Sequence, residues 1–206
     1  MVRAMAKERD SDWEEYYDNT AGRPPRRTLM LALERFGASE GRKAVDLGCG
    51  DGRDTVELLR RGWRVIAIDA ESAAIERLET RRDLSRRQAL TVICRRFEDT
   101  RWPKVDLVNA SFALPLCPPE RFAEVWQRIE RSLLPGGRFA GQFFGERDQF
   151  RGEEGITLLD RAAIERLLAG FTIELLEEEE TDTRTPQGKP KHWHLFHVVA
   201  QKRPSP

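Results

Sequence analysis

The sequence predicts an α/β fold with a mostly parallel sheet, because short apolar runs alternate with segments of helical periodicity. Five of these runs are expected to be strands, at residues 43–47, 64–68, 90–95, 105–109 and 137–144. Helices are expected at residues 26–36, 53–61, 72–82, 119–134 and 160–169. Parallel strands joined by right-handed helical crossovers place helices on both faces of the sheet.

The C-terminal end breaks this alternation. Residues 171–180 and 191–200 are typical of two long strands, and the polar segment 181–190 joins them without a helix. Two such strands must be antiparallel neighbours. We therefore expect a seven-stranded, mostly parallel sheet that ends in an antiparallel hairpin.

The first strand leads directly into a glycine-rich loop. Glycines stand at positions 48, 50 and 52, ahead of the helix expected at 53–61. Glycine has no Cβ, so such a loop lets backbone approach a small molecule closely, and the following helix offers unpaired N–H groups. This arrangement predicts a nucleotide-like pocket at the carboxyl end of the first strand.

The spacing in this loop argues against a dinucleotide. A G-x-G-x-x-G pattern that starts at Gly48 would need glycine where Arg53 stands, and one that starts at Gly50 would need it at Thr55. Asp46 also precedes the loop, and its carboxylate would repel a pyrophosphate but would suit a cationic amine.

The second expected strand also ends in an acid, Asp69. At the tip of this strand a carboxylate can accept two hydrogen bonds from a ribose diol. The structural alternative is that Asp69 caps the helix that opens at residues 71–73. Asp69 can bind a ribose and cap this helix at the same time.

The run Asp46-Leu-Gly-Cys-Gly-Asp-Gly52 resembles the first motif of class I S-adenosylmethionine (SAM)-dependent methyltransferases, as do Asp69 and the Pro135-Gly-Gly137 turn. The resemblance spans nearly the whole chain, and the glycine loop looks like that of the tellurite-resistance and thiopurine branch. It implies a Rossmann-like class I methyltransferase fold and methyl transfer from SAM to a small-molecule acceptor, with S-adenosylhomocysteine as product. SAM carries an ammonium, a sulfonium and no phosphate, which agrees with the charges around the loop.

The resemblance implies a set of cofactor-binding residues at the strand ends. They are Asp46, Gly48, Cys49, Gly50, Asp51, Gly52, Arg53, Asp69, Ala70, Phe97, Glu98, Asn109, Ala110 and Ser111. Arg96 stands where the family often has an aspartate that bonds adenine, which leaves Phe97 and Glu98 for that role. Acceptor contacts are expected from Phe112, Gln142, Phe143 and Trp193.

The N-terminal segment has two interpretations. Trp13, Tyr16 and Tyr17 are at helical spacing, so they favour either a short helix packed on the body or a lid. A lid would exclude water, with Tyr17 and Arg23 on the methionine carboxylate of SAM and Trp13 and Tyr16 near the acceptor. We therefore divide the chain into a lid or helical segment, 1–36, and a methyltransferase domain, 37–206.

His192 and His194 are the candidate general bases. The last strand is antiparallel, so it begins at the edge of the sheet where the parallel strands end. Both histidines share one face of that strand and Trp193 takes the other. The alternative is that the histidines are hydrogen-bonded polar groups at a strand end. No spacing supplies a complete metal-ligand set, so no metal is expected.

Composition excludes several classes of function. Lys plus Arg balance Asp plus Glu, at 35 each, so no global field favours nucleic acid or an anionic membrane. We expect a cytoplasmic protein, because the sequence has neither a signal-peptide pattern nor an apolar stretch of membrane-spanning length. Two other functions fit a nucleotide pocket: a SAM- or nucleoside-binding regulator without turnover, and an NAD(P)-linked oxidoreductase, which the absent third glycine disfavours.

Overall fold

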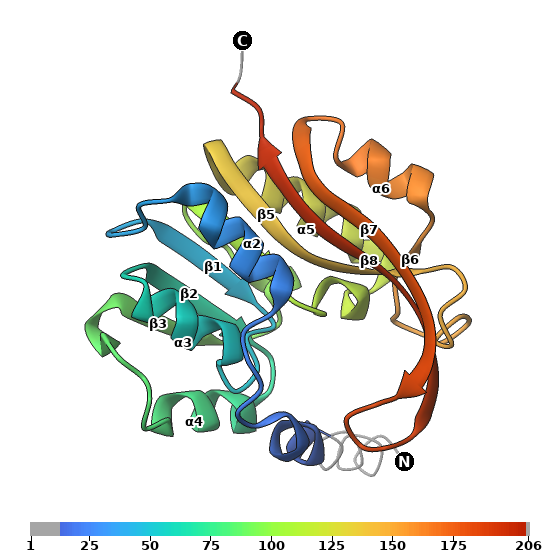
Figure 1. Ribbon diagram of the computed structural model, residues 1–206, viewed down its shortest axis with the longest axis horizontal. Coiled ribbons are helices and arrows are strands. Elements are labelled where there is room, and N and C mark those ends of the chain that lie inside the picture. Colours follow the sequence, from blue (N-terminus) through green and yellow to red (C-terminus); the bar gives the residue numbers. More distant parts are fainter. Residues whose placement is uncertain (1–12, 205–206) are drawn as a thin grey trace.

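One central sheet with helices on both faces forms the body of the computed structural model, which describes residues 13–204 (Figure 1). The strands follow the order β3-β2-β1-β4-β5-β8-β7. Their bounds are β1 (Lys43–Leu47), β2 (Arg64–Asp69), β3 (Leu90–Cys94), β4 (Val105–Ala110), β5 (Leu133–Gly145), β7 (Phe171–Arg184) and β8 (Pro190–Lys202).

The strand directions confirm the predicted fold class. The first five strands pair in parallel, and β8 lies antiparallel between β5 and β7. An eighth strand, β6 (Leu158–Leu159), pairs in parallel with the end of β5 and was not predicted. Two residues are too few to show the alternation by which strands are found in a sequence.

The helices cover both faces. α2 (Arg27–Phe36), α3 (Arg53–Arg60) and α4 (Ser72–Thr80) bury apolar side chains on one face, and α5 (Pro119–Ser132) and α6 (Arg161–Leu167) on the other. Residues 13–20 are also helical. The described residues also form three short 3₁₀ turns: η1 (Arg87–Ala89), η2 (Phe97–Asp99) and η3 (Leu114–Leu116).

The β7–β8 hairpin is longer than expected. Pairing between β5 and β8 stops at Phe144 and Leu195, whereas β7 and β8 stay paired as far as Arg184 and Pro190. The hairpin therefore extends past the carboxyl end of β5, where it curves away from the rest of the sheet (Figure 1). Half of the polar segment 181–190 belongs to these strands: residues 181–184 continue β7 and Pro190 begins β8. Asp182 pairs across the hairpin with His192.

Gly48 is a position at which the fold requires glycine. Its φ is +63°, and a Cβ placed there would lie 2.6 Å from the Cβ of Ala113, which follows β4. The turn after β1 and the segment after β4 are therefore in direct contact.

Replacing Gly48 by alanine is expected to destabilise the protein more than the same change at Gly188. Both glycines have positive φ, but a Cβ at Gly188 would meet nothing within 4 Å. We expect Gly188→Ala to lower the free energy of unfolding by about 1–2 kcal/mol. Gly48→Ala should lower it by about 1–3 kcal/mol more, because it also overpacks the turn. Urea unfolding of both variants measures the difference, and equal losses would show that Ala113 does not constrain the loop.

Candidate active site

Polar side chains meet at the carboxyl ends of β1, β2 and β4. Parallel register sets Asp46 opposite Asn109 on β4, and Asp69 ends β2 beside them. The glycine loop that follows β1 therefore lies among three neighbouring strand ends, which is where ligands bind in open α/β sheets.

A buried amide joins two carboxylates at this edge. Asp46 is 2% exposed, and it accepts hydrogen bonds from the Thr55 hydroxyl at 2.6 Å and from Asn109 Nδ2 at 2.9 Å. The same Nδ2 lies 3.0 Å from Asp54 Oδ2. Asn109 therefore bridges β1 to the first turn of α3.

Asp54 extends this network and was missed in the sequence. It also accepts from Ser111 Oγ at 2.6 Å and from the backbone N–H of Arg26 at 2.9 Å. Asn109 and Ser111, both predicted, are thus brought together by a residue that was not. The signal for Asp54 is an acid in the first turn of the helix after the loop, a position that the helix dipole favours in any helix.

Burial and, next, the nearby Asp54 carboxylate together raise the pKa of Asp46 to about 7, against the hydrogen bonds from Thr55 and Asn109. Asp46 faces α3 and β4, so it does not stand open above the loop. Both of its oxygens already accept hydrogen bonds, and a cationic amine would meet only their remaining lone pairs.

Asp69 holds the loop and the next turn together. Its Oδ2 accepts from the backbone N–H of Gly50 at 2.8 Å, and its Oδ1 accepts from that of Glu71 at 3.0 Å. The predicted N-cap role of Asp69 is not observed, because Glu71 is the N-cap of α4 and the bond from Asp69 reaches only the backbone N–H of Glu71. Each oxygen keeps a second lone pair, and the side chain lies at the surface of the core with 9% of its area exposed.

The N-terminal helix lies over the glycine loop. A Cβ on Gly50 would be 3.1 Å from the Tyr17 ring, and Trp13 stacks on Tyr17 with ring centroids 6.1 Å apart. Burial, and then the Asp69 charge, raise the pKa of Tyr17, so its hydroxyl stays protonated. This position of the Trp13 and Tyr17 rings agrees with both interpretations of the segment, a packed helix and a lid.

Arg53 begins α3 with an unused hydrogen-bond donor. Its Nε donates to the carbonyl oxygen of Pro24 at 2.6 Å, but its Nη1 is buried without a hydrogen-bond partner among residues 13–204. Burial lowers the pKa of Arg53, and the neighbouring Arg26 and Arg23 lower it further. A buried, unsatisfied guanidinium nitrogen is a position suited to an anionic group.

An aromatic wall stands beyond the end of β4. The Phe112 ring lies 6.3 Å from that of Trp193 and 6.4 Å from that of Phe144. Phe112 has a φ of +58°, and its backbone N–H donates to Gln142 Oε1 at 3.0 Å. Gln142 is buried and also donates to Thr28 Oγ1, so it supports this wall from behind. Phe144 was not predicted, although strand alternation sets it on the face of Gln142.

The same alternation places Phe143 on the opposite face, in the core. Phe143 is 1% exposed and stacks on Phe139, with Trp126 of α5 also against it. Its prediction as an acceptor contact is therefore wrong, because consecutive residues of a strand cannot line one face.

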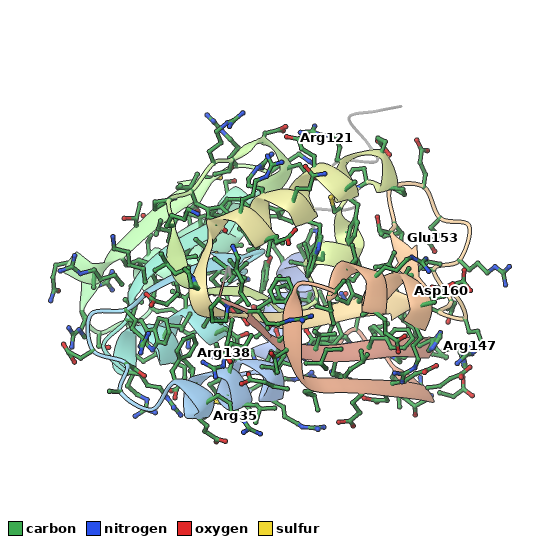
Figure 2. The ribbon with its side chains drawn as sticks, turned by 90° about the horizontal axis from the view of Figure 1, so that it is seen from above. Arg35, Arg121, Arg138, Arg147, Glu153 and Asp160 are labelled. Atoms are coloured by element: carbon green, nitrogen blue, oxygen red, sulfur yellow. The ribbon has the colours of Figure 1, made fainter. Side chains whose placement is uncertain are left out.

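The contacts of the two candidate bases argue against that role. His194 Nδ1 accepts from the backbone N–H of Arg147 at 3.1 Å, which leaves the proton on Nε2, 3.0 Å from Glu178 Oε1. His192 lies between Asp182 at 2.8 Å and Glu180 at 3.2 Å. Both rings occupy the face of β8 opposite Trp193. Arg147 joins this cluster by pairing with Glu178 and Glu180. Figure 2 shows Arg147 at the end of the molecule away from Arg138.

The remaining predicted residues lie at the loop or at the ends of the outer strands. Glu98 is 3% exposed, and Arg96 Nη2 donates to it at 2.7 Å. Arg96, which stands where the family often has an aspartate, therefore already engages the Glu98 carboxylate.

Phe97 and Ala110 are buried in the core of the α5 face. Ala70 is exposed next to Cys94, which is also exposed. Cys49 is buried, Asp51 lies 3.6 Å from Arg81, Gly52 packs on Leu78 and Arg23 is exposed.

Within the described range 13–204, no group of three or more His, Cys, Asp or Glu side chains is placed to hold a metal ion. No helix in that range has both the length and the apolar character needed to span a bilayer.

Asp46→Asn is expected to stabilise the protein at alkaline pH. The folded carboxyl has a pKa raised to about 7, so between pH 4 and 7 the folded state binds more protons than the unfolded state. Stability then falls as the pH rises through this window. Asparagine removes the loss, because its oxygen can accept from Asn109 and its NH2 group can donate to the Thr55 hydroxyl, the reverse of the present bond. The gain in free energy of unfolding should be about 1–4 kcal/mol larger at pH 8 than at pH 4.5.

Urea unfolding at the two pH values measures this gain, and Asp99→Asn, at an exposed aspartate, is the control that should show none. A gain of equal size at both pH values would mean that Asp46 is ionised throughout.

Comparisons with known proteins agree with this geometry. A family model described as a methyltransferase domain matches residues 44–137. An uncharacterized methyltransferase of Synechocystis sp. is 35% identical over 113 residues, which cover 54% of this chain and 51% of the relative. The chain thus spans about half the length of that curated relative.

Solved structures share the whole fold at low sequence identity. TehB from Haemophilus influenzae matches 93% of this chain and 67% of its own, with a TM-score of 0.74 and 13% identity. The magnesium protoporphyrin IX methyltransferase of Synechocystis PCC 6803 matches 93% of this chain and 91% of its own, with a TM-score of 0.68 and 15% identity. The 1,6-didemethyltoxoflavin-N1-methyltransferase of Burkholderia thailandensis matches 99% of this chain and 91% of its own, with a TM-score of 0.66 and 20% identity. Residues 44–137 are therefore similar to a methyltransferase domain, and the described chain shares the fold of these solved structures.

Proposed function

We propose that this protein transfers a methyl group from SAM to a small-molecule acceptor. The observation that carries the proposal is a pair of groups at the glycine loop: the Asp69 carboxylate, which accepts from the backbone N–H of Gly50, and the unsatisfied guanidinium of Arg53, which begins the helix after the loop. A ligand that fits both has a diol at one end and an anion at the other. A nucleoside linked to an amino acid has this form.

We assign each polar group around the loop to one part of SAM. The free lone pairs of Asp69 suit the two ribose hydroxyls, and Arg53 Nη1 suits the methionine carboxylate. The remaining lone pairs of Asp46 are those left for the ammonium. Tyr17 lies directly over Gly50, so the N-terminal helix would cover the bound molecule.

When bound, SAM supplies a methyl group activated by its positive sulfur, and displacement by a lone pair of the acceptor leaves S-adenosylhomocysteine and a methylated product. The residues of this chain would hold the acceptor in line and exclude water. Orientation of this kind supplies roughly 7–11 kcal/mol of a reaction barrier. Phe112 and Trp193 are the side chains that we assign to the acceptor, because they form one apolar wall.

No general base is part of this proposal. Each nitrogen of His192 and His194 is within hydrogen-bond distance of a backbone or side-chain partner. An acceptor that arrives ionised needs no base, and the related Burkholderia structure contains 1,6-didemethyltoxoflavin, a small molecule, together with S-adenosylhomocysteine.

Calorimetric titration tests the cofactor directly. We expect S-adenosylhomocysteine and SAM to bind with one site per chain and NADH not to bind, because a third glycine is absent and the Asp46 carboxylate would repel a pyrophosphate. Incubation with methyl-labelled SAM and a panel of thiols, phenols, carboxylates and metalloid oxyanions then measures turnover. NADH binding in place of SAM would contradict the proposal, and SAM binding without turnover of any acceptor would favour a regulator.

Arg53→Gln is expected to weaken S-adenosylhomocysteine binding about 10- to 100-fold, because it removes a charged hydrogen bond to the carboxylate. Binding of 5′-methylthioadenosine, which lacks the amino-acid end, should change less than about threefold. Arg60→Gln, on an exposed arginine of the same helix that pairs with Glu57, is the matched control. If Arg53→Gln weakens binding of both ligands equally, Arg53 does not bind the carboxylate of S-adenosylhomocysteine.

A further inference from the structure

Arg26 carries a positive charge that no carboxylate among residues 13–204 neutralises. Its guanidinium carbon lies 4.4 Å from the centroid of the Phe112 ring, and its Nη2 donates to the Tyr16 hydroxyl at 3.3 Å. The side chain is half-buried and forms no ion pair with any described acid. Asp54 binds the backbone N–H of Arg26, and not its guanidinium.

This lack of an ion pair sets Arg26 apart from the other arginines stacked on aromatic rings in the part of the chain that the structure describes. Each of the others also pairs with an acid: Arg42 with Asp106, Arg77 with Asp18, Arg128 with Glu124, Arg138 with Glu174 and Arg161 with Glu178. The next residue, Arg27, pairs with Glu177.

The neighbouring cation on the aromatic wall is already compensated. Lys191 Nζ lies 4.2 Å from the Trp193 ring centroid, but it is buried and pairs with Asp148 at 2.6 Å. Within residues 13–204, Arg26 is therefore the cation at this wall that is not paired with an acid. Its guanidinium keeps further N–H donors beyond the one used by Tyr16.

The ring beneath Arg26 is held in an unfavourable backbone conformation. Phe112 has a φ of +58°, uncommon for a residue with a Cβ, and Gln142 fixes its backbone N–H. Strained residues that the surrounding structure holds in place cluster at ligand-binding sites. Phe112 and Trp193 are both partly exposed, so their rings offer apolar contact beside the charge.

We propose that the methyl acceptor is a planar aromatic molecule with an anionic group, in which Arg26 pairs with the anion and Phe112 and Trp193 contact the ring. This inference rests on the proposed function and names the chemistry of its acceptor. A guanidinium fork binds a planar carboxylate through two parallel hydrogen bonds, and it stays charged at any working pH.

The test compares two probes of the same ring, 2-naphthoate and 2-naphthamide, titrated into the full chain saturated with S-adenosylhomocysteine. Naphthoate is expected to bind at least about tenfold more tightly, the value of one charged hydrogen-bonded pair. Arg26→Gln should abolish this preference and change S-adenosylhomocysteine affinity less than about threefold. Arg27→Gln, which removes the same charge from the adjacent residue, should keep the preference.

Equal binding of the two probes, or binding of neither, would overturn the inference and leave S-adenosylhomocysteine binding and turnover intact. Arg26→Gln that weakens S-adenosylhomocysteine but not the preference would assign Arg26 to the cofactor and also overturn it. If Arg26→Gln does not fold, Arg26→Lys keeps the charge and should retain a preference for naphthoate, whose loss would count against the proposal. Wild-type protein that fails to bind S-adenosylhomocysteine contradicts the proposed function itself.

Discussion

The amide of Asn109 lies between two buried carboxylates, and the arrangement of the site depends on it. Asp46 and Asp54 would repel each other across the ends of β1 and α3 if this donor were absent, since burial removes the water that would screen them. Each carboxylate is completed by a hydroxyl, from Thr55 or Ser111. A buried polar network of this kind rigidifies a structure only when all of its members are satisfied.

The same network sets the position of the surrounding ligand-binding groups. Asp54 fixes the backbone at Arg26, so the segment that precedes α2 is held against the start of α3. Gln142 in turn links the backbone of Phe112 to Thr28 of α2. The glycine loop and the aromatic wall are therefore held by one hydrogen-bond network. The same hydrogen bonds would orient a bound methyl donor and its acceptor. Rigid support of this kind is what a displacement reaction requires from its protein.

The fold was predictable because residues close together in the sequence determine it: apolar strand segments, glycines at three alternate positions and the Pro-Gly-Gly turn. The acids near the ends of β1 and β2, Asp46 and Asp69, were found for the same reason. Asp54 and Arg26 were not, since their meaning depends on partners that are distant in the sequence or, for Arg26, on a partner that is missing. His192 and His194 were assigned to the correct sheet edge, but the row of acids on β7 that engages them follows from cross-strand register. Phe143 was an avoidable error, because strand alternation already separated it from Gln142.

The central claim is that Asp69 and Arg53 hold the two ends of one nucleoside-linked amino acid. A crystal structure of the protein with S-adenosylhomocysteine tests it most directly. The account predicts both ribose hydroxyls within hydrogen-bond distance of Asp69 and the terminal carboxylate at Arg53 Nη1, beneath the Tyr17 ring. A ribose away from Asp69, or a carboxylate that leaves Arg53 Nη1 unpaired, would contradict it.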